Sequence, residues 1–127
     1  MKILVVDDQQ DIRELAASLL TGDGYEVGTA GDGLDALERL ESERFDLVLL
    51  DINMPRMDGW ETLRLIRADA EWRDLPVVMF SIKSETVDKV QGMQEGALDY
   101  ITKPFEVDEF LRRVRRALET AAERGVV

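Results

Sequence analysis

One segment near the middle of the chain constrains the fold more than any other. Residues 45–50, Phe-Asp-Leu-Val-Leu-Leu, contain five apolar residues among six, and Asp51 follows at once. A short apolar run rich in branched residues is typical of a strand buried on both faces of a parallel sheet. Pro55 and Gly59 then predict a loop. Ligands bind at the carboxyl edge of open α/β sheets, so Asp51 is either a site residue or a residue that forms a turn or caps a helix.

The same alternation of strand and helix runs along the whole chain. Strands are expected at residues 2–6, 25–30, 45–50, 76–80 and 98–102, and helices at about 9–21, 34–42, 58–68 with Asp58 as cap, 84–95 and 107–122. The apolar positions of the first and last helices are Ile12, Leu15, Ala16, Leu19 and Leu20, and Val107, Phe110, Leu111, Val114, Leu118 and Ala121. Five strands and five helices joined by short loops predict an α/β fold with a doubly wound parallel sheet.

Composition limits the number of domains and the location. With 127 residues the chain has room for one domain, expected at residues 1–122, followed by a C-terminal tail at 123–127. No apolar run approaches the ~20 residues that span a bilayer, and the N-terminus does not resemble a secretory signal. We therefore expect a cytoplasmic protein without a membrane segment. The net charge of −11 argues against nucleic-acid binding by this domain.

The residue types that are missing restrict the chemistry further. The chain has neither Cys nor His. Thiolate metal sites, the commonest zinc ligand and any Ser-His-Asp machinery are therefore excluded. What remains is carboxylates, lysines and hydroxyls, together with a hard cation that prefers oxygen ligands. Mg²⁺ is the natural expectation.

Reactive side chains follow four of the five expected strands. The first strand ends at Asp7 and Asp8, the third at Asp51, the fourth at Ser81 and the fifth at Lys103. Because parallel strands end at one edge of a sheet, these five side chains should converge there. Three clustered carboxylates resist full ionisation, and a divalent cation relieves their repulsion. An Asp carboxylate can attack phosphorus, so this grouping predicts a site for phosphoryl transfer to Asp51.

The motifs, taken in order and spacing, resemble the receiver domains of two-component response regulators over essentially the whole chain. The resemblance implies the strand order 2-1-3-4-5, a phosphorylation-activated switch and an Mg²⁺ cofactor. It rests on Val5-Val6-Asp7-Asp8, Asp51-Ile-Asn-Met-Pro55, Met57-Asp58-Gly59, Ser81, Gly96-Ala-Leu-Asp-Tyr100 and Lys103-Pro104-Phe105.

The resemblance also implies roles for individual residues. Asp51 would accept the phosphoryl group, Asp8 would bind Mg²⁺ directly, Asp7 would hold the metal's waters and Asn53 would offer its backbone carbonyl. Lys103, joined to Pro104 by a cis bond, would pair with the phosphoryl group.

Two further residues would form the switch. Ser81 would move to bond a phosphoryl oxygen, and Tyr100 would follow it inward; alternatively Tyr100 is simply a half-buried side chain. Ile82 departs from the family pattern, which has a small residue there, so we expect slow phosphorylation, slow dephosphorylation or both, with altered rates in Ile82→Ala.

Partners follow from the same resemblance. A histidine kinase or a histidine phosphotransfer protein would donate the phosphoryl group, and a downstream protein would bind the surface of helix 4, strand 5 and helix 5. The chain would be a monomer or a phosphorylation-dependent dimer. The last helix holds Arg112, Arg113, Arg115 and Arg116, which form either a docking patch or a solvated face paired with Glu109 and Glu119.

Two other classes of protein stay open from sequence alone. One is a receiver-like interaction module that is not phosphorylated, although such modules usually lose an acid or the lysine. The other is an Mg²⁺-dependent phosphatase with an Asp nucleophile. Phosphatases of that kind place Asp-x-Asp after the first strand, whereas this chain has Asp7-Asp8-Gln9. The expected protein is therefore a switch and not an enzyme that turns over external substrates.

Overall fold

The computed structural model describes residues 1–81 and 96–124. The strands in these ranges are β1 (Lys2–Val6), β2 (Glu26–Ala30), β3 (Leu47–Asp51), β4 (Val77–Ser81) and β5 (Asp99–Thr102). The helices are α1 (Gln10–Gly22), α2 (Gly33–Ser42), α3 (Gly59–Ala68) and α5 (Val107–Glu123). The helix expected at 84–95 and the side chain of Ile82 lie outside the described residues.

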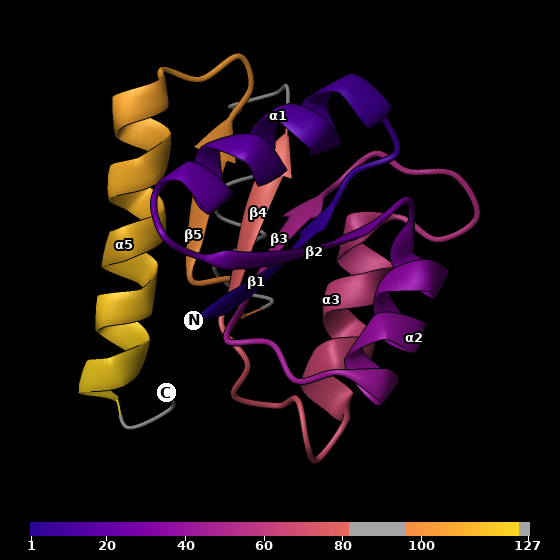
Figure 1. The fold of residues 1–127 in the computed structure, drawn as a ribbon. Helices are drawn as coiled ribbons and strands as arrows, with labels where there is room; N and C mark the ends of the chain where they lie inside the picture. Colours follow the sequence, from indigo (N-terminus) through magenta and orange to yellow (C-terminus); the bar gives the residue numbers. More distant parts are fainter. Residues whose placement is uncertain (82–95, 125–127) are drawn as a thin grey trace.

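The five strands form one parallel sheet in the order β2-β1-β3-β4-β5 (Figure 1). This confirms the expected doubly wound α/β fold. The apolar residues of the central strands are fully buried, as a parallel sheet covered on both faces requires. Because every strand runs in the same direction, all five end at one edge of the sheet.

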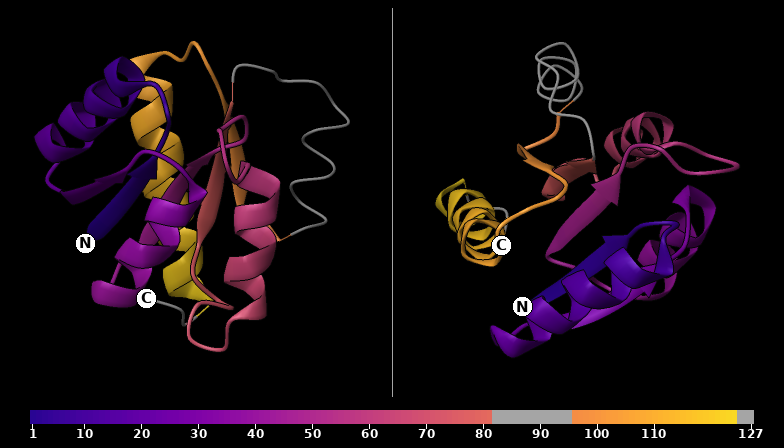
Figure 2. Two further views of the ribbon diagram at one scale, coloured as in Figure 1. Left: turned by 90° about the vertical axis from the view of Figure 1, so that its right-hand side faces the viewer. Right: turned by 90° about the horizontal axis from the view of Figure 1, so that it is seen from above.

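Each face of the sheet has its own apolar cluster. Ala36, Leu40, Leu63 and Ile66 of α2 and α3 pack on one face, and α1 and α5 cover the other. Viewed from above, α3 and α5 lie on opposite sides of the sheet (Figure 2). None of the helices within residues 1–81 and 96–124 combines the length and the apolarity that a membrane span needs.

Two apolar residues expected in the core are exposed instead. Leu15 is 47% exposed because the buried stripe of α1 centres on Ala16 and Leu20, and helical geometry places Leu15 at least 100° away from both. Val107 is 45% exposed because it begins α5, one turn before the first fully buried side chain, Phe110.

The ends of the elements also shift by one or two residues. β2, β4 and β5 begin one residue later than expected, and β3 covers Leu47–Asp51. Asp51 is therefore the last residue of its strand, and its backbone is paired with Phe80 of β4. This pairing fixes the position of Asp51 relative to the rest of the edge.

Candidate functional site

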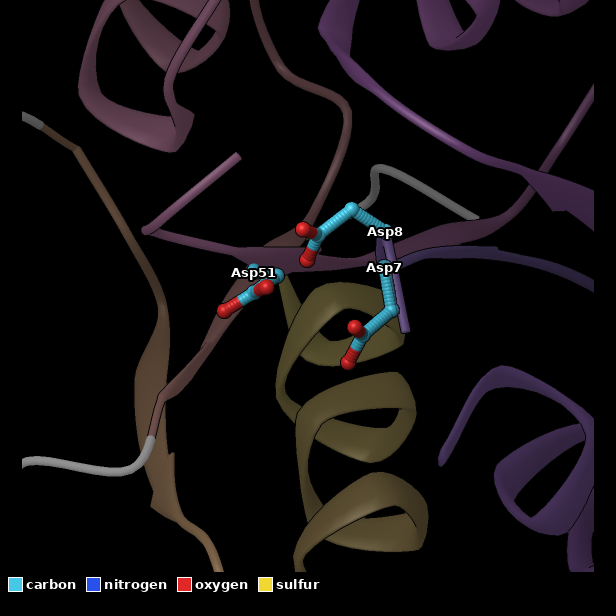
Figure 3. Close-up of side chains that lie close together, drawn as sticks. All are labelled: Asp7, Asp8 and Asp51. Atoms are coloured by element: carbon cyan, nitrogen blue, oxygen red, sulfur yellow. The ribbon is translucent and has the colours of Figure 1, made fainter. Parts of the chain in front are cut away.

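Three carboxylates meet at the carboxyl edge of the sheet, as the sequence predicts. Asp7 and Asp8 follow β1 directly, and Asp51 ends the neighbouring strand β3. One oxygen of each lies within 4.8 Å of the others, and Figure 3 shows the three side chains gathered beside one another. Asp7 and Asp51 are buried, while Asp8 is exposed. The group is thus open to solvent on the side of Asp8.

Lys103 reaches this group from β5, two strands away from β3. Its Nζ lies 2.8 Å from Asp7 Oδ2 and 3.5 Å from Asp51 Oδ1, and the residue is only 5% exposed. Its ammonium also lies 4.8 Å from the centroid of the Phe80 ring, a cation–π contact that covers one side of the charge. The bond between Lys103 and Pro104 is cis, as the resemblance implies.

Ser81 lies on β4, the strand between β3 and β5, and Tyr100 lies on β5, the strand that Lys103 follows. Ser81 ends β4 and is buried, and its carbonyl accepts from the Lys103 backbone N–H at 2.6 Å. Tyr100 is 6% exposed and belongs to the cluster that packs under α2 and α3. It is therefore buried inward and not half-buried, the alternative weighed from sequence.

Asp7 is held firmly in its orientation. Its Oδ1 accepts from the Gln9 backbone N–H at 2.9 Å, and its Oδ2 accepts from Lys103. Its own carbonyl accepts from Arg13 Nη1 at 2.8 Å. Asp7 therefore has a fixed orientation, with a hydrogen-bond partner on each carboxylate oxygen.

The surroundings of Asp51 disfavour the ionised form of its carboxyl group. Burial raises its pKa, Lys103 lowers it, and the carboxylates of Asp7 and Asp8 raise it again, to about 7 from an ordinary value of 3.8. One ammonium does not balance three carboxylates. A divalent cation among them would favour the ionised form of Asp51, which is the nucleophilic form.

The donor set fits a hard cation such as Mg²⁺. Mg²⁺ is bound through one or two carboxylates and keeps several waters, and the exposed carboxylate of Asp8 and the buried carboxylate of Asp51 offer two such ligands. Asn53 lies two residues after Asp51, with its side chain exposed. The excess of negative charge at a buried edge is the observation that favours such an ion.

The loop that follows Asp51 turns sharply beneath the site. Gly59 N–H donates to the Ile52 carbonyl at 2.8 Å, so the two ends of the loop are tied together. A Cβ on Gly59 would lie 2.8 Å from Ile52 Cα and closer still to the Asp51 carbonyl oxygen. The glycine is thus required by the close approach of the two backbones. Asp58 caps α3 by accepting from Glu61 N–H at 2.9 Å, as expected.

One ion pair beside the site was not anticipated from sequence. Arg56, in the loop after β3, donates to Asp32, which caps α2. The two residues are 24 positions apart and lie in loops, where the sequence has no period to relate them. The nearest signal is an arginine that lies between the Asp51–Pro55 and Met57–Gly59 motifs.

Only some of the arginines of α5 form ion pairs within the described residues. Arg113 pairs with Glu109, as one alternative predicted, and also with Asp99. Arg115 pairs with Asp23, and the Glu119 pairing is not found within the described residues. Arg112 and Arg116 are exposed and form no ion pair within that part of the chain.

Comparison with known proteins identifies the family. The family model of the response regulator receiver domain matches residues 3–115. The chain is 45% identical over 115 residues to the transcriptional regulatory protein DltR of Streptococcus agalactiae, which covers 91% of this chain and 50% of DltR. It is 44% identical over 117 residues to the DNA-binding response regulator MtrA of Mycobacterium tuberculosis, covering 92% and 50%. The chain thus spans about half the length of these relatives.

Solved structures agree in fold. The receiver domain of NtrX from Brucella abortus matches with a TM-score of 0.87 and 41% identity, covering 93% of this chain and 98% of that one. The chemotaxis protein CheY4 of Vibrio cholerae also matches with 0.87, at 34% identity, covering 91% and 97%. Proteins with this domain are phosphorylation-controlled signalling switches and not metabolic enzymes. The chain belongs to the family of response regulator receiver domains.

Proposed function

We propose that Asp51 accepts a phosphoryl group, with Mg²⁺ bound beside it, and that this modification controls partner binding. The observation that supports the proposal most directly is the convergence of Lys103 and three carboxylates on one edge of the sheet. Neither a turn-forming aspartate nor a capping aspartate explains why a buried lysine reaches from the end of β5 across β4 toward Asp51.

The transfer is a substitution at phosphorus. A carboxylate oxygen of Asp51 attacks, a new P–O bond forms, and the bond to the donor's nitrogen or oxygen breaks with the electron pair leaving on the donor. Lys103, 3.5 Å from Asp51 Oδ1, is placed to pair with the phosphoryl oxygens. Its contact with Asp7 keeps the ammonium at the site before the phosphoryl group arrives.

The metal would be held by the carboxylates of Asp8 and Asp51 and the backbone carbonyl of Asn53, with Asp7 orienting its waters. When bound, Mg²⁺ supplies positive charge that neutralises the phosphoryl oxygens. Asp7 already uses both carboxylate oxygens in contacts with Lys103 and Gln9. This supports a supporting role for Asp7 and leaves Asp8 as the more available ligand.

The switch would act through β4 and β5. We expect Ser81 to bond a phosphoryl oxygen and Tyr100, already buried, to be held inward by that shift. Ser81 and Lys103 are linked by a backbone hydrogen bond of 2.6 Å, so a displacement of one backbone segment should displace the other. The output surface would then be helix 4, β5 and α5, where Arg112 and Arg116 are exposed.

The phosphoryl donor would be a histidine kinase or a histidine phosphotransfer protein, and the downstream partner a protein. The curated relatives are about twice as long, and some are named DNA-binding regulators. With a net charge of −11, this domain itself is not expected to contact nucleic acid.

Intact-mass spectrometry tests the proposal. Incubation with acetyl phosphate and Mg²⁺ should add about 80 Da, the mass of one phosphoryl group. Omission of Mg²⁺ should suppress the gain, and Asp51→Asn should abolish it. A chain that gains no mass under conditions that modify another receiver domain would instead support an interaction module that is not phosphorylated.

A further inference from the structure

The loop of residues 52–58 is tied to the start of α2 by one arginine. Arg56 Nε donates to Asp32 Oδ2 at 2.8 Å, and Nη2 donates to the same oxygen. Nη2 also lies 3.7 Å from Asp35 Oδ1. The Asp32 side chain is 9% exposed, whereas the Arg56 side chain is 57% exposed. A buried carboxylate is thus paired from the solvent side by a residue of the loop that follows Asp51.

The two oxygens of Asp32 have separate partners. Oδ1 accepts from Asp35 N–H at 2.9 Å and caps α2, while Oδ2 receives Arg56. Burial opposes the ionised form of Asp32, but the Asp35 N–H and the Arg56 guanidinium together lower its pKa below the ordinary value. The cap and the ion pair can therefore be separated by substitution.

The backbone at Arg56 is strained. Its φ is +67°, in the left-handed region, and Met57 N–H donates to the Pro55 carbonyl at 2.7 Å. Together these define a γ-turn with a left-handed central residue, which is rare for a residue with a Cβ. Such a conformation costs ~1–2 kcal/mol and persists where the surroundings hold it. The side chain of Arg56 is held by its hydrogen bonds to Asp32, which are among the contacts that surround this turn.

The pair fixes the tip of a loop whose ends are fixed already. The Gly59–Ile52 hydrogen bond closes the base of the loop. At the tip, Met57 lies against Gly33, where an added Cβ would come within 3.1 Å of Met57 Cγ. The Arg56–Asp32 pair supplies the directional contact at that end, so it sets how the loop lies relative to Asp51.

We infer that the Arg56–Asp32 pair is a positioning device for the metal site. It holds the loop so that the backbone of Asn53, two residues after Asp51, stays in place to bind the cation. The inference rests on the proposed function, in which the Asn53 carbonyl is an Mg²⁺ ligand. Neither Arg56 nor Asp32 belongs to the carboxylate group, so losing their pair should weaken Mg²⁺ binding without removing any ligand.

Two substitutions isolate the ion pair. Arg56→Gly removes the guanidinium while allowing the left-handed backbone without strain. Asp32→Asn removes the charge while keeping a residue that caps helices as well as Asp does. Isothermal titration calorimetry of the full chain with MgCl₂ should show that each variant binds about tenfold more weakly, the lower end of the roughly 10–100-fold loss typical of residues that support metal ligands. The double variant should bind no more weakly than either single variant, because both remove one interaction.

Arg73→Ala is the matched control. Arg73 is an exposed arginine in the loop before β4, at the opposite edge of the sheet, and the substitution makes the same change in net charge. The charge match is to Arg56→Gly, since Asp32→Asn changes the net charge in the opposite direction. Arg73→Ala should leave Mg²⁺ affinity unchanged. If the unsubstituted chain binds Mg²⁺ and all variants bind equally well, the positioning role is wrong and the proposed function stands. If the losses of Mg²⁺ affinity in the two single variants add in the double variant, the two residues do not act as a pair, and the inference is wrong. No Mg²⁺ binding by the unsubstituted chain would overturn both proposals.

Discussion

Asp51 combines burial with an acidic neighbourhood, and this gives a testable linkage between pH and stability. In the folded chain its pKa is raised to about 7, mainly by burial, from an ordinary value of 3.8. The folded state therefore binds more protons than the unfolded state between about pH 4 and pH 7. Asp51 contributes its full share of stability below the lower value, and that share is lost as the pH rises through the higher one.

Replacing Asp51 by Asn should therefore stabilise the chain most at high pH. In Mg²⁺-free buffer we expect the rise in Tm caused by Asp51→Asn to be larger at pH 8 than at pH 5. Differential scanning calorimetry measures both. Glu41→Gln, at an exposed position and with the same change in net charge, controls for general relief of charge repulsion. Equal gains from both substitutions at both pH values would show that Asp51 is not under electrostatic strain.

At the scale of elements, the β3–α3 connection depends on the absence of a side chain at Gly59. The backbone of Gly59 lies so close to β3 that a Cβ would meet Ile52 and the Asp51 carbonyl. The first turn of α3 therefore packs directly against the backbone of Asp51, the proposed phosphoryl acceptor. A larger residue at position 59 should therefore lower the stability of the chain and displace Asp51.

Gly59→Ala should destabilise the chain by about 1–3 kcal/mol, the usual cost of overpacking. Urea unfolding followed by circular dichroism measures the free energy. Gly22→Ala is the control, because no atom lies within 4 Å of a Cβ at Gly22 and a helix favours Ala. If the two alanine variants are equally stable, the contact beneath Asp51 is not as close as described.

The sequence predicts regular elements well and loop contacts poorly. Apolar runs and helical spacing predicted the bounds of the nine described elements to within two residues. Because parallel strands end at one edge of a sheet, the sequence also predicted that Asp7, Asp8, Asp51 and Lys103 lie together. The strand order came only from the resemblance, since spacing does not determine which strands pair. The Arg56–Asp32 pair could not be predicted, because its partners lie in loops brought together by the packing of α2 against α3.

At the scale of the whole molecule, a cation at the edge of the sheet should stabilise an acidic chain whose net charge is −11. A ligand that binds only the folded state raises stability by RT ln(1 + [L]/Kd). The effect should depend on the carboxylate group and not on ionic strength alone.

Mg²⁺ should therefore raise the Tm of the chain at pH 8 in a concentration-dependent way. NaCl at matched ionic strength should have a smaller effect, since screening acts on all exposed charges. Asp8→Asn should remove most of the Mg²⁺-specific rise, whereas Asp11→Asn, an exposed aspartate in the first turn of α1, should not. If Mg²⁺ raises the Tm of both variants equally, the cation binds outside the carboxylate group.

The identity of the phosphoryl acceptor is tested most directly by chemical trapping. After treatment with acetyl phosphate and Mg²⁺, borohydride reduces an aspartyl phosphate to homoserine, and peptide mapping then locates the reduced residue. We predict homoserine at position 51 and unmodified aspartate at positions 7 and 8. Homoserine at either of those positions, or none at position 51 in a chain that has gained a phosphoryl group, would contradict the assignment of Asp51.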